Sequence, residues 1–266
     1  MAHIPSIRDL QCSYLRLLDE QRKEQDYQTF LEENTRLIPR EFVQNHGIHF
    51  DLVLRKLSLA KDYTTDLFYL AKSSGNWNCV LIELEKPQSR YFKNEGNDFH
   101  PDFQRALEQI NTWRAWFADP NQFNGFINGT IRPLRVPVAL AANPCHIKYV
   151  LVHGRRIEFE QNESRRRLIS AQEREEDFHI LSYDSLLESL HAKSELYVGR
   201  RMNERIELVS TKFAGESIIG TLPPEYLRLN PELRSDILAH RSEWIHYETD
   251  GGKLLLDHSL PLVKDA

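Results

Sequence analysis

Three consecutive segments in which apolar and polar residues alternate constrain the fold of this chain more than any other feature. They read "HFDLVLRKLSL" (49–59), "TTDLFYLA" (64–71) and "NCVLIELEK" (78–86). A period of two is typical of β-strands, because successive side chains point to opposite faces of a sheet. The connections "AKDY" and "KSSGNW" are short enough for hairpins. The sequence therefore predicts a three-stranded antiparallel meander.

Helical and strand patterns on both sides of the meander complete the expected fold. The expected elements, in chain order, are helices at 6–37 and 98–117, an irregular stretch at 119–146, a strand at 147–154, a helix at 161–177, a strand at 178–183 and a helix at 184–196. Asp98 and Asp184 are expected to cap their helices. Because hairpin strands come first, we predict an α/β fold with a mixed sheet flanked by helices, and not an alternating parallel-sheet fold.

Composition excludes several classes of protein. No apolar run approaches the roughly 20 residues that span a bilayer, so we expect no membrane partner. The N-terminus lacks an apolar core followed by a small-residue cleavage site, and the three cysteines stand far apart, which fits a reducing cytoplasm. The chain contains no P-loop and no G-x-G-x-x-G sequence, and we expect no small-molecule cofactor.

The formal net charge is −5, whereas proteins dominated by nonspecific nucleic-acid binding are usually basic. Any contact with nucleic acid must therefore use local basic patches. The largest is the run Arg165, Arg166 and Arg167, which is our candidate for binding DNA phosphates. The alternative, that this run is a solvated surface, stays open because charge runs usually are.

Two acids stand close together in the third strand, which contains "VLIELEKP" (80–87). Glu83 and Glu85 are two positions apart, so both carboxylates point to the same face of the strand. Asp66 is a third acid, in the second strand, and a hairpin would let it meet this pair. Like charges this close repel unless a cation, a proton or bulk water intervenes. The pattern favours either an exposed polar face or a site where carboxylates hold a hard divalent cation.

The order of several short motifs resembles the PD-(D/E)XK nuclease superfamily and, more narrowly, the C-terminal nuclease domain of the Shedu antiphage defence proteins. The motifs are "FLEENT" with "LIP", then "TDLFYL", "VLIELEKP" and "ALEQINTW", and finally "ILSYDSLL". The resemblance covers roughly residues 25–190. It implies a restriction-endonuclease-like core and a divalent-metal-dependent DNA endonuclease in bacterial antiphage defence.

Three residues match metal-binding positions of that superfamily. Asp66 and Glu83 match its two acidic ligands, and the backbone carbonyl of Leu84 would be a third ligand of a Mg²⁺ or Mn²⁺ ion. Where the motif has a lysine this chain has Glu85, and the neighbouring Lys86 would point to the opposite face of an ideal strand. Some restriction enzymes of the superfamily carry E-x-E and remain active. Glu85 is therefore expected either to act beside the attacking water, as a metal ligand or base, or to mark a changed activity.

Two further elements of the resemblance lie on helices. Gln109, four residues before Trp113, matches the glutamine that orients the site in RecB-like nucleases. The alternative for Gln109 is a polar residue that flanks an apolar helix stripe. Glu32 or Glu33 matches the acid that the first helix sometimes supplies, and a solvated helix face is the alternative for at least one of them.

These assignments divide the chain into an N-terminal helical segment (1–24), a nuclease domain (25–199) and a C-terminal extension (200–266) to which we assign no role. We expect a cytoplasmic DNA endonuclease that uses Mg²⁺ or Mn²⁺ and forms a homo-oligomer. Because of Glu85, the alternative is a DNA-binding or assembly module with an inactive, degenerate nuclease fold. A purely structural interaction protein is a third class, and it would lack affinity for DNA at low salt.

Overall fold

The computed structural model describes residues 6–59, 61, 63–173, 175–222, 226–240, 244–246 and 254–256. The strands of its main sheet are β1 (Ile48–Arg55), β4 (Leu67–Lys72), β5 (Trp77–Leu84), β6 (Cys145–Val152), β7 (Phe178–Leu181), β8 (Tyr197–Met202), β9 (Arg205–Leu208) and β10 (Leu227–Leu229). They form one eight-stranded mixed sheet in the order β10-β9-β8-β1-β4-β5-β6-β7. Two further hairpins are formed by β2 (Ser58–Leu59) with β3 (Tyr63–Thr64) and by β11 (Trp244–His246) with β12 (Leu254–Leu256).

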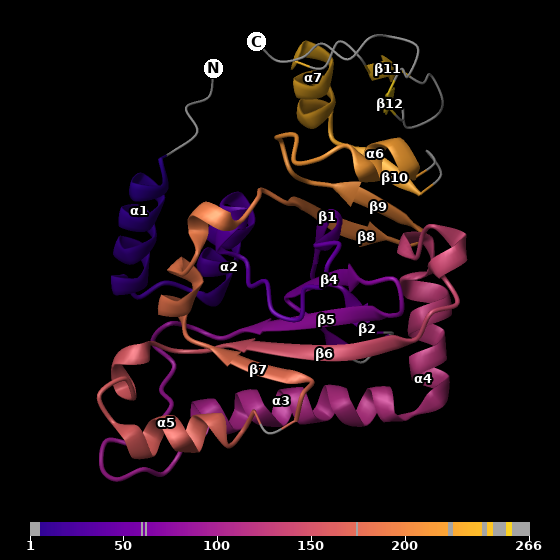
Figure 1. Cartoon of the computed structure of the whole chain (residues 1–266). Helices are drawn as coiled ribbons and strands as arrows, with labels where there is room; N and C mark the ends of the chain where they lie inside the picture. The colour runs from indigo at the N-terminus through magenta and orange to yellow at the C-terminus, as the bar shows by residue number, and fades with distance from the viewer. Residues whose placement is uncertain are drawn as a thin grey trace.

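Helices cover both faces of this sheet (Figure 1). They are α1 (Ile7–Asp19), α2 (Glu24–Glu33), α3 (Pro101–Ala118), α4 (Pro120–Gly125), α5 (Glu163–Ser170), α6 (Ser217–Thr221) and α7 (Pro231–His240). Helices α1 and α2 lie on one side of the central strands, and α3 runs along the other side (Figure 1). This arrangement of helices on both faces of a mixed sheet confirms the predicted mixed α/β architecture. None of the described helices is both long enough and apolar enough to cross a membrane.

The predicted antiparallel meander is present and consists of β1, β4 and β5. Strand β4 lies between the other two and pairs antiparallel with both, whereas β6 and β7 then add parallel to β5. The first expected strand is shorter than its alternating pattern, because β1 ends at Arg55 and Lys56 adopts a left-handed conformation (φ 45°). The chain then makes the small β2–β3 hairpin before β4 begins at Leu67. Asp66 therefore lies in a bend directly before β4, and not within a strand as we expected.

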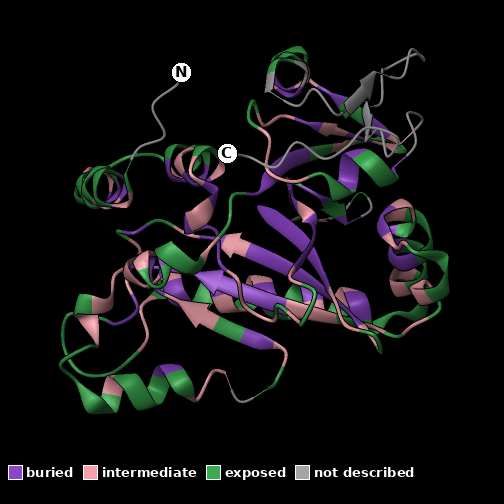
Figure 2. Ribbon diagram, turned by 45° about the horizontal axis from the view of Figure 1, so that its top comes forward, coloured by how far each residue is buried: buried purple, intermediate pink, exposed green. Residues whose placement is uncertain are grey.

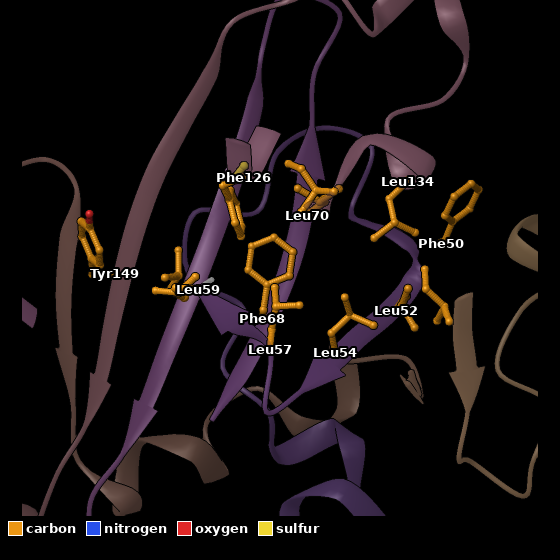
Figure 3. Packing of buried hydrophobic residues seen from close by; sticks show 14 of the residues in the cluster. Phe50, Leu52, Leu54, Leu57, Leu59, Phe68, Leu70, Phe126, Leu134 and Tyr149 are labelled. Carbon is orange, nitrogen blue, oxygen red and sulfur yellow. The ribbon is translucent and has the colours of Figure 1, made fainter. Parts of the chain in front are cut away.

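Both faces of the central strands are buried, which explains why β5 is apolar along almost its whole length. On one face Phe68 and Leu81 pack in the cluster that contains Trp113 of α3. On the other face Val80 and Ile82 belong to the cluster that contains residues of α1 and α2. Figure 2 shows the central strands buried between helices whose outer sides are exposed, and Figure 3 shows the first of these clusters around Phe68.

The expected helix at 6–37 is two helices, because the chain turns between Asp19 and Glu24. The hydroxyl of Tyr27, on α2, holds this turn: it accepts the N–H of Arg22 (3.2 Å) and donates to the carbonyl of Glu20. A tertiary contact of one side chain therefore decides where the first helix stops. Helical periodicity continues through the turn and does not reveal it.

Other helix boundaries also differ from expectation. Helix α3 begins at Pro101 with His100 as its cap, and not at Asp98. The expected helix at 184–196 is two 3-10 turns, and Ser182, not Asp184, caps the first of them. The irregular stretch at 119–146 contains α4 and several short turns, and α5 covers only the first half of its expected range.

The sheet continues into the C-terminal part of the chain. Strand β8 crosses the expected boundary at residue 200 and pairs in parallel with β1. Strand β9 then pairs antiparallel with β8, and β10 pairs in parallel with β9. Residues beyond 200 therefore extend the same sheet that carries the meander.

A glycine is required at position 154, just after β6, because the chain there passes close to the segment that follows β5. Its φ is +52°, and an added Cβ would lie 2.5 Å from the carbonyl oxygen of Ser89. We expect Gly154→Ala to destabilise the protein by roughly 2–4 kcal/mol through left-handed strain and overpacking, as measured by urea denaturation. Gly75→Ala is the matched control, because nothing lies within 4 Å of the place its Cβ would take and its φ is not positive. Equal effects of the two substitutions would show that position 154 does not require glycine.

Candidate active site

The meander brings Asp66 and Glu83 to the same end of the sheet. Leu67 of β4 pairs with Ile82 of β5, so Asp66, one residue before β4, is level with Glu83. By strand alternation the Glu83 side chain lies on the face that α3 covers. Asp66 is buried and Glu83 is half-buried. Glu85 follows directly after the last residue of β5 and is also half-buried.

Asp66 is held from three directions. Its Oδ2 accepts the N–H of Leu84 (2.7 Å), and its Oδ1 forms an ion pair with Nζ of Lys56. Its backbone carbonyl accepts the N–H of Lys56 (2.8 Å) and the side-chain amide of Gln28 (3.3 Å). Because the N–H and C=O of one strand residue point to the same neighbour, the Leu84 carbonyl also faces the Asp66 side of β5. That is the side on which the expected third metal ligand must lie.

Glu83 lies in an unfavourable environment for a carboxylate. Burial raises its pKa well above the ordinary range, and the charges of Asp66, Glu85 and Glu24 raise it further. The charge of Lys56 opposes this shift and is the smallest of the influences. Burial and the neighbouring acids therefore both disfavour the ionised form of Glu83.

Glu85 has a fixed backbone and a constrained side chain. Its N–H donates to the carbonyl of Val152 (2.8 Å), and its own carbonyl accepts the hydroxyl of Tyr183. Burial raises the pKa of its carboxyl, Glu24 raises it further, and a hydrogen bond from Ser89 (3.4 Å) lowers it. Tyr183 belongs to "ILSYDSLL", so that motif positions the strand end that carries the acids. In the sequence, only the order of the motifs indicated that Tyr183 supports the strand end.

Helix α2 supplies further polar groups at a spacing of four residues. Glu24, Gln28 and Glu32 share one helix face, on which Gln28 donates to Glu32 (2.8 Å) and Glu32 pairs with Arg55 (2.9 Å). Of the two acids expected from this helix, Glu32 thus faces the site and Glu33 is exposed. Glu24 acts electrostatically on Glu83 and Glu85, and the motifs in the sequence did not reveal it. The repeated spacing of four was the signal that could have found it.

Gln109 is not joined to the acids by any hydrogen bond of the described residues. It is half-buried on α3, and Trp113, its expected companion, is fully buried in the core. The residue of α3 whose charge reaches Glu85 is Asp102. Gln109 lies seven residues further along, or about 10 Å at 1.5 Å per residue. An orienting function of Gln109 stays a prediction.

The three consecutive arginines have different surroundings on α5. Arg165 donates to the carbonyls of Gly96 (2.7 Å) and Glu158 (3.0 Å) and stacks on Phe92. It therefore fastens the loop before α3 to α5. Arg166 and Arg167 are exposed. Arg166 donates to the backbone carbonyl of Glu160, and Arg167 pairs with Glu163, one turn earlier in the helix. Their contact with DNA stays a prediction.

The donors at the sheet end suit a hard cation in their chemistry. Asp66, Glu83, Glu85 and the Leu84 carbonyl offer only oxygen atoms, which Mg²⁺ and Mn²⁺ prefer. Burial, and after it the charges of Asp66, Glu85 and Glu24, raise the pKa of Glu83, and a bound cation would oppose this shift. As the side chains stand, however, no group of three or more His, Cys, Asp and Glu residues in the described part of the chain is arranged to hold a metal ion. Binding would require the acids to converge and Lys56 to release Asp66.

These features define a mixed α/β protein with a crowded group of carboxylates at the end of its central strands. The family model for the C-terminal part of the Shedu protein SduA matches residues 21–187. This match covers more than half of the chain, so the chain belongs to the Shedu family, and membership implies a role in antiphage defence. The predicted family is therefore confirmed. A search of curated proteins gives no match to the chain.

The crowding at Glu83 predicts a pH-dependent cost in the metal-free protein. Because its folded-state pKa is raised, the folded protein holds more protons than the unfolded chain above about pH 4.3, and stability falls as pH rises. Glu83→Gln should remove this cost. We expect a gain on the order of 1 kcal/mol, or roughly 2–4 °C in Tm, at pH 8 and little difference at pH 4.

The measurement is thermal unfolding in EDTA between pH 4 and pH 8. Glu108→Gln, at an exposed position of α3, is the matched control and should follow the wild type. If the stability difference between Glu83→Gln and the wild type is the same at every pH, the assigned environment of Glu83 is wrong.

Proposed function

We propose that this chain is a divalent-metal-dependent DNA endonuclease with a PD-(D/E)XK-like core, acting in antiphage defence. The carrying observation is that β4 and β5 bring Asp66 and Glu83 level with each other, with Glu85 immediately after them. Membership of the Shedu family supports the same conclusion. DNA is the proposed substrate, and a second copy of the chain in the cytoplasm is the proposed partner.

Asp66, Glu83 and the backbone carbonyl of Leu84 would hold the Mg²⁺ or Mn²⁺ ion. When bound, the ion would polarise the phosphodiester, lower the pKa of the attacking water and stabilise the leaving oxygen. Glu85 would accept the proton of that water or add a further ligand. The oxygen of the water forms its bond to phosphorus while the bond from phosphorus to the leaving oxygen breaks. The backbone hydrogen bonds of Glu85 with Val152 and Tyr183 hold this residue directly after β5.

The second candidate is a DNA-binding or assembly module with an inactive nuclease fold. Glu85, at the position of the motif lysine, favours it, and so does the present arrangement of the acids, which is not closed around a metal. The two candidates differ in one measurement, the nicking of supercoiled plasmid in Mg²⁺ or Mn²⁺. The second candidate binds DNA without cutting it.

Loss of either acidic ligand should abolish cleavage and leave the fold intact. We expect Asp66→Asn and Glu83→Gln each to reduce plasmid nicking by about 100-fold or more, because ligand loss removes the charge stabilisation that the metal supplies. Asparagine is chosen because its amide oxygen can still accept the N–H of Leu84, which alanine would leave unpaired in the interior. Asp98→Asn, an exposed acid, is the control. Wild-type nicking by either ligand variant would end the metal-site assignment.

The exposed part of the arginine run tests DNA binding separately. We expect Arg166→Gln with Arg167→Gln to reduce the log–log salt slope of DNA affinity by up to about 1.8, because each phosphate contact contributes about 0.9. Arg165 is left unchanged because it holds a loop. Fluorescence anisotropy with a duplex at several salt concentrations is the measurement. An unchanged slope would make these two arginines a solvated surface.

A further inference from the structure

Lys56 approaches the acids from the end of β1, whereas the motif "VLIELEKP" lies on and directly after β5. It directly follows β1, with a left-handed backbone (φ 45°), and its N–H donates to the Asp66 carbonyl (2.8 Å). Its Nζ contacts Oδ1 of Asp66, the acid expected to bind the metal. The side chain of Lys56 is 40% exposed and that of Asp66 is 7% exposed, so the lysine is the solvent-accessible member of this pair.

The sheet order explains how a lysine from β1 can serve acids on β5. Strand β4 lies between β1 and β5, and Asp66 precedes β4 at the level where both neighbours end. Arg55 pairs with Leu67, which in turn pairs with Ile82. Lys56 therefore approaches Asp66 from one side, while Glu83 approaches from the other. Figure 1 shows these three strands side by side.

Lys56 is also the cation whose charge is felt most widely among these acids. Its charge acts on Glu24, Glu32 and Glu83, which lie on two different elements. Lys86, the lysine nearest to the motif in sequence, is exposed and forms no ion pair in the described part of the chain. The structure thus favours Lys56 over Lys86 as the cation of the site.

We propose that Lys56 supplies, from the end of β1, the ammonium group that this chain lacks at position 85. It would donate hydrogen bonds to the attacking water and to a non-bridging oxygen of the scissile phosphate, leaving Asp66 free to hold a divalent cation. This inference rests on the proposed nuclease function and assigns one residue to it. A lysine side chain that is partly exposed to solvent can turn from Asp66 to a phosphate without moving its strand.

Two consequences with opposite signs follow from this assignment. A cation held by Asp66 would have to displace Nζ of Lys56 from this carboxylate, so removing the ammonium group would remove a competitor and a repelling charge, and metal binding should tighten. The same change removes a donor from the phosphate, so cleavage should slow. A merely structural lysine would not combine tighter metal binding with slower cleavage.

The experiment compares Lys56→Met, Lys56→Gln, Lys56→Arg and Lys86→Met in the full chain, with thermal unfolding to verify the fold. Mn²⁺ affinity is measured by calorimetry, and nicking of supercoiled plasmid is measured under single-turnover conditions at saturating Mn²⁺. We expect both neutral Lys56 variants to bind Mn²⁺ about 3-fold to 10-fold more tightly and to nick about 30-fold or more slowly. Lys56→Arg should keep part of the rate, and Lys86→Met should match the wild type in both measurements.

The outcomes separate this inference from the proposed function. If the wild type nicks plasmid and the neutral Lys56 variants do so equally fast, this inference alone is overturned. Loss of the rate in Lys86→Met, with Lys56→Met unaffected, would give the function to the other lysine. Slower cleavage with unchanged Mn²⁺ affinity would also overturn the competition between Lys56 and the cation for Asp66. A wild type that nicks with neither Mg²⁺ nor Mn²⁺ overturns the proposed function, and this inference with it.

Discussion

The Asp66 carboxylate joins three strands at the point where the sheet ends, and the arrangement of the site depends on it. It accepts the N–H of Leu84 from β5 and pairs with Lys56, which follows β1, while its own residue leads into β4. Before β4 begins, this side chain thus replaces a ladder hydrogen bond of the backbone. The contacts that close the sheet therefore also hold the Asp66 carboxylate, and Lys56 would have to release it before a cation could bind there.

The supporting contacts come from segments far apart in the chain. Gln28 of α2 holds the Asp66 carbonyl, and Tyr183 holds the carbonyl of Glu85. The two faces of the sheet are filled by separate apolar clusters, so the strand ends can carry charged groups without opening the core. The scaffold holds the acids together and they do not stabilise one another, since burial and then the charges of Asp66 and Glu85 raise the pKa of Glu83.

The sequence predicted the meander and the common face of Glu83 and Glu85, because a period of two determines both. It could not place Asp66 before the strand, since the left-handed turn at Lys56 leaves no mark on hydrophobic alternation. Glu24 was missed because its spacing of four from Gln28 shows a shared helix face but does not show that this face packs toward the acids. Strands β9 and β10 are too short to show a pattern and become strands by pairing with β8 and with each other.

The charge balance of the site has a consequence for the order in which ligands bind. Asp66, Glu83, Glu85 and Glu24 lie near the ammonium group of Lys56, and ionisation of all four carboxyl groups would make the site net negative before a cation enters. A DNA phosphate brings one more negative charge and is repelled by such a site. With lysine at position 85, as in the superfamily motif, the site would be two charge units more positive and would repel a phosphate less. In the proposed nuclease the glutamate at this position therefore couples DNA engagement at the sheet end to prior binding of a divalent cation.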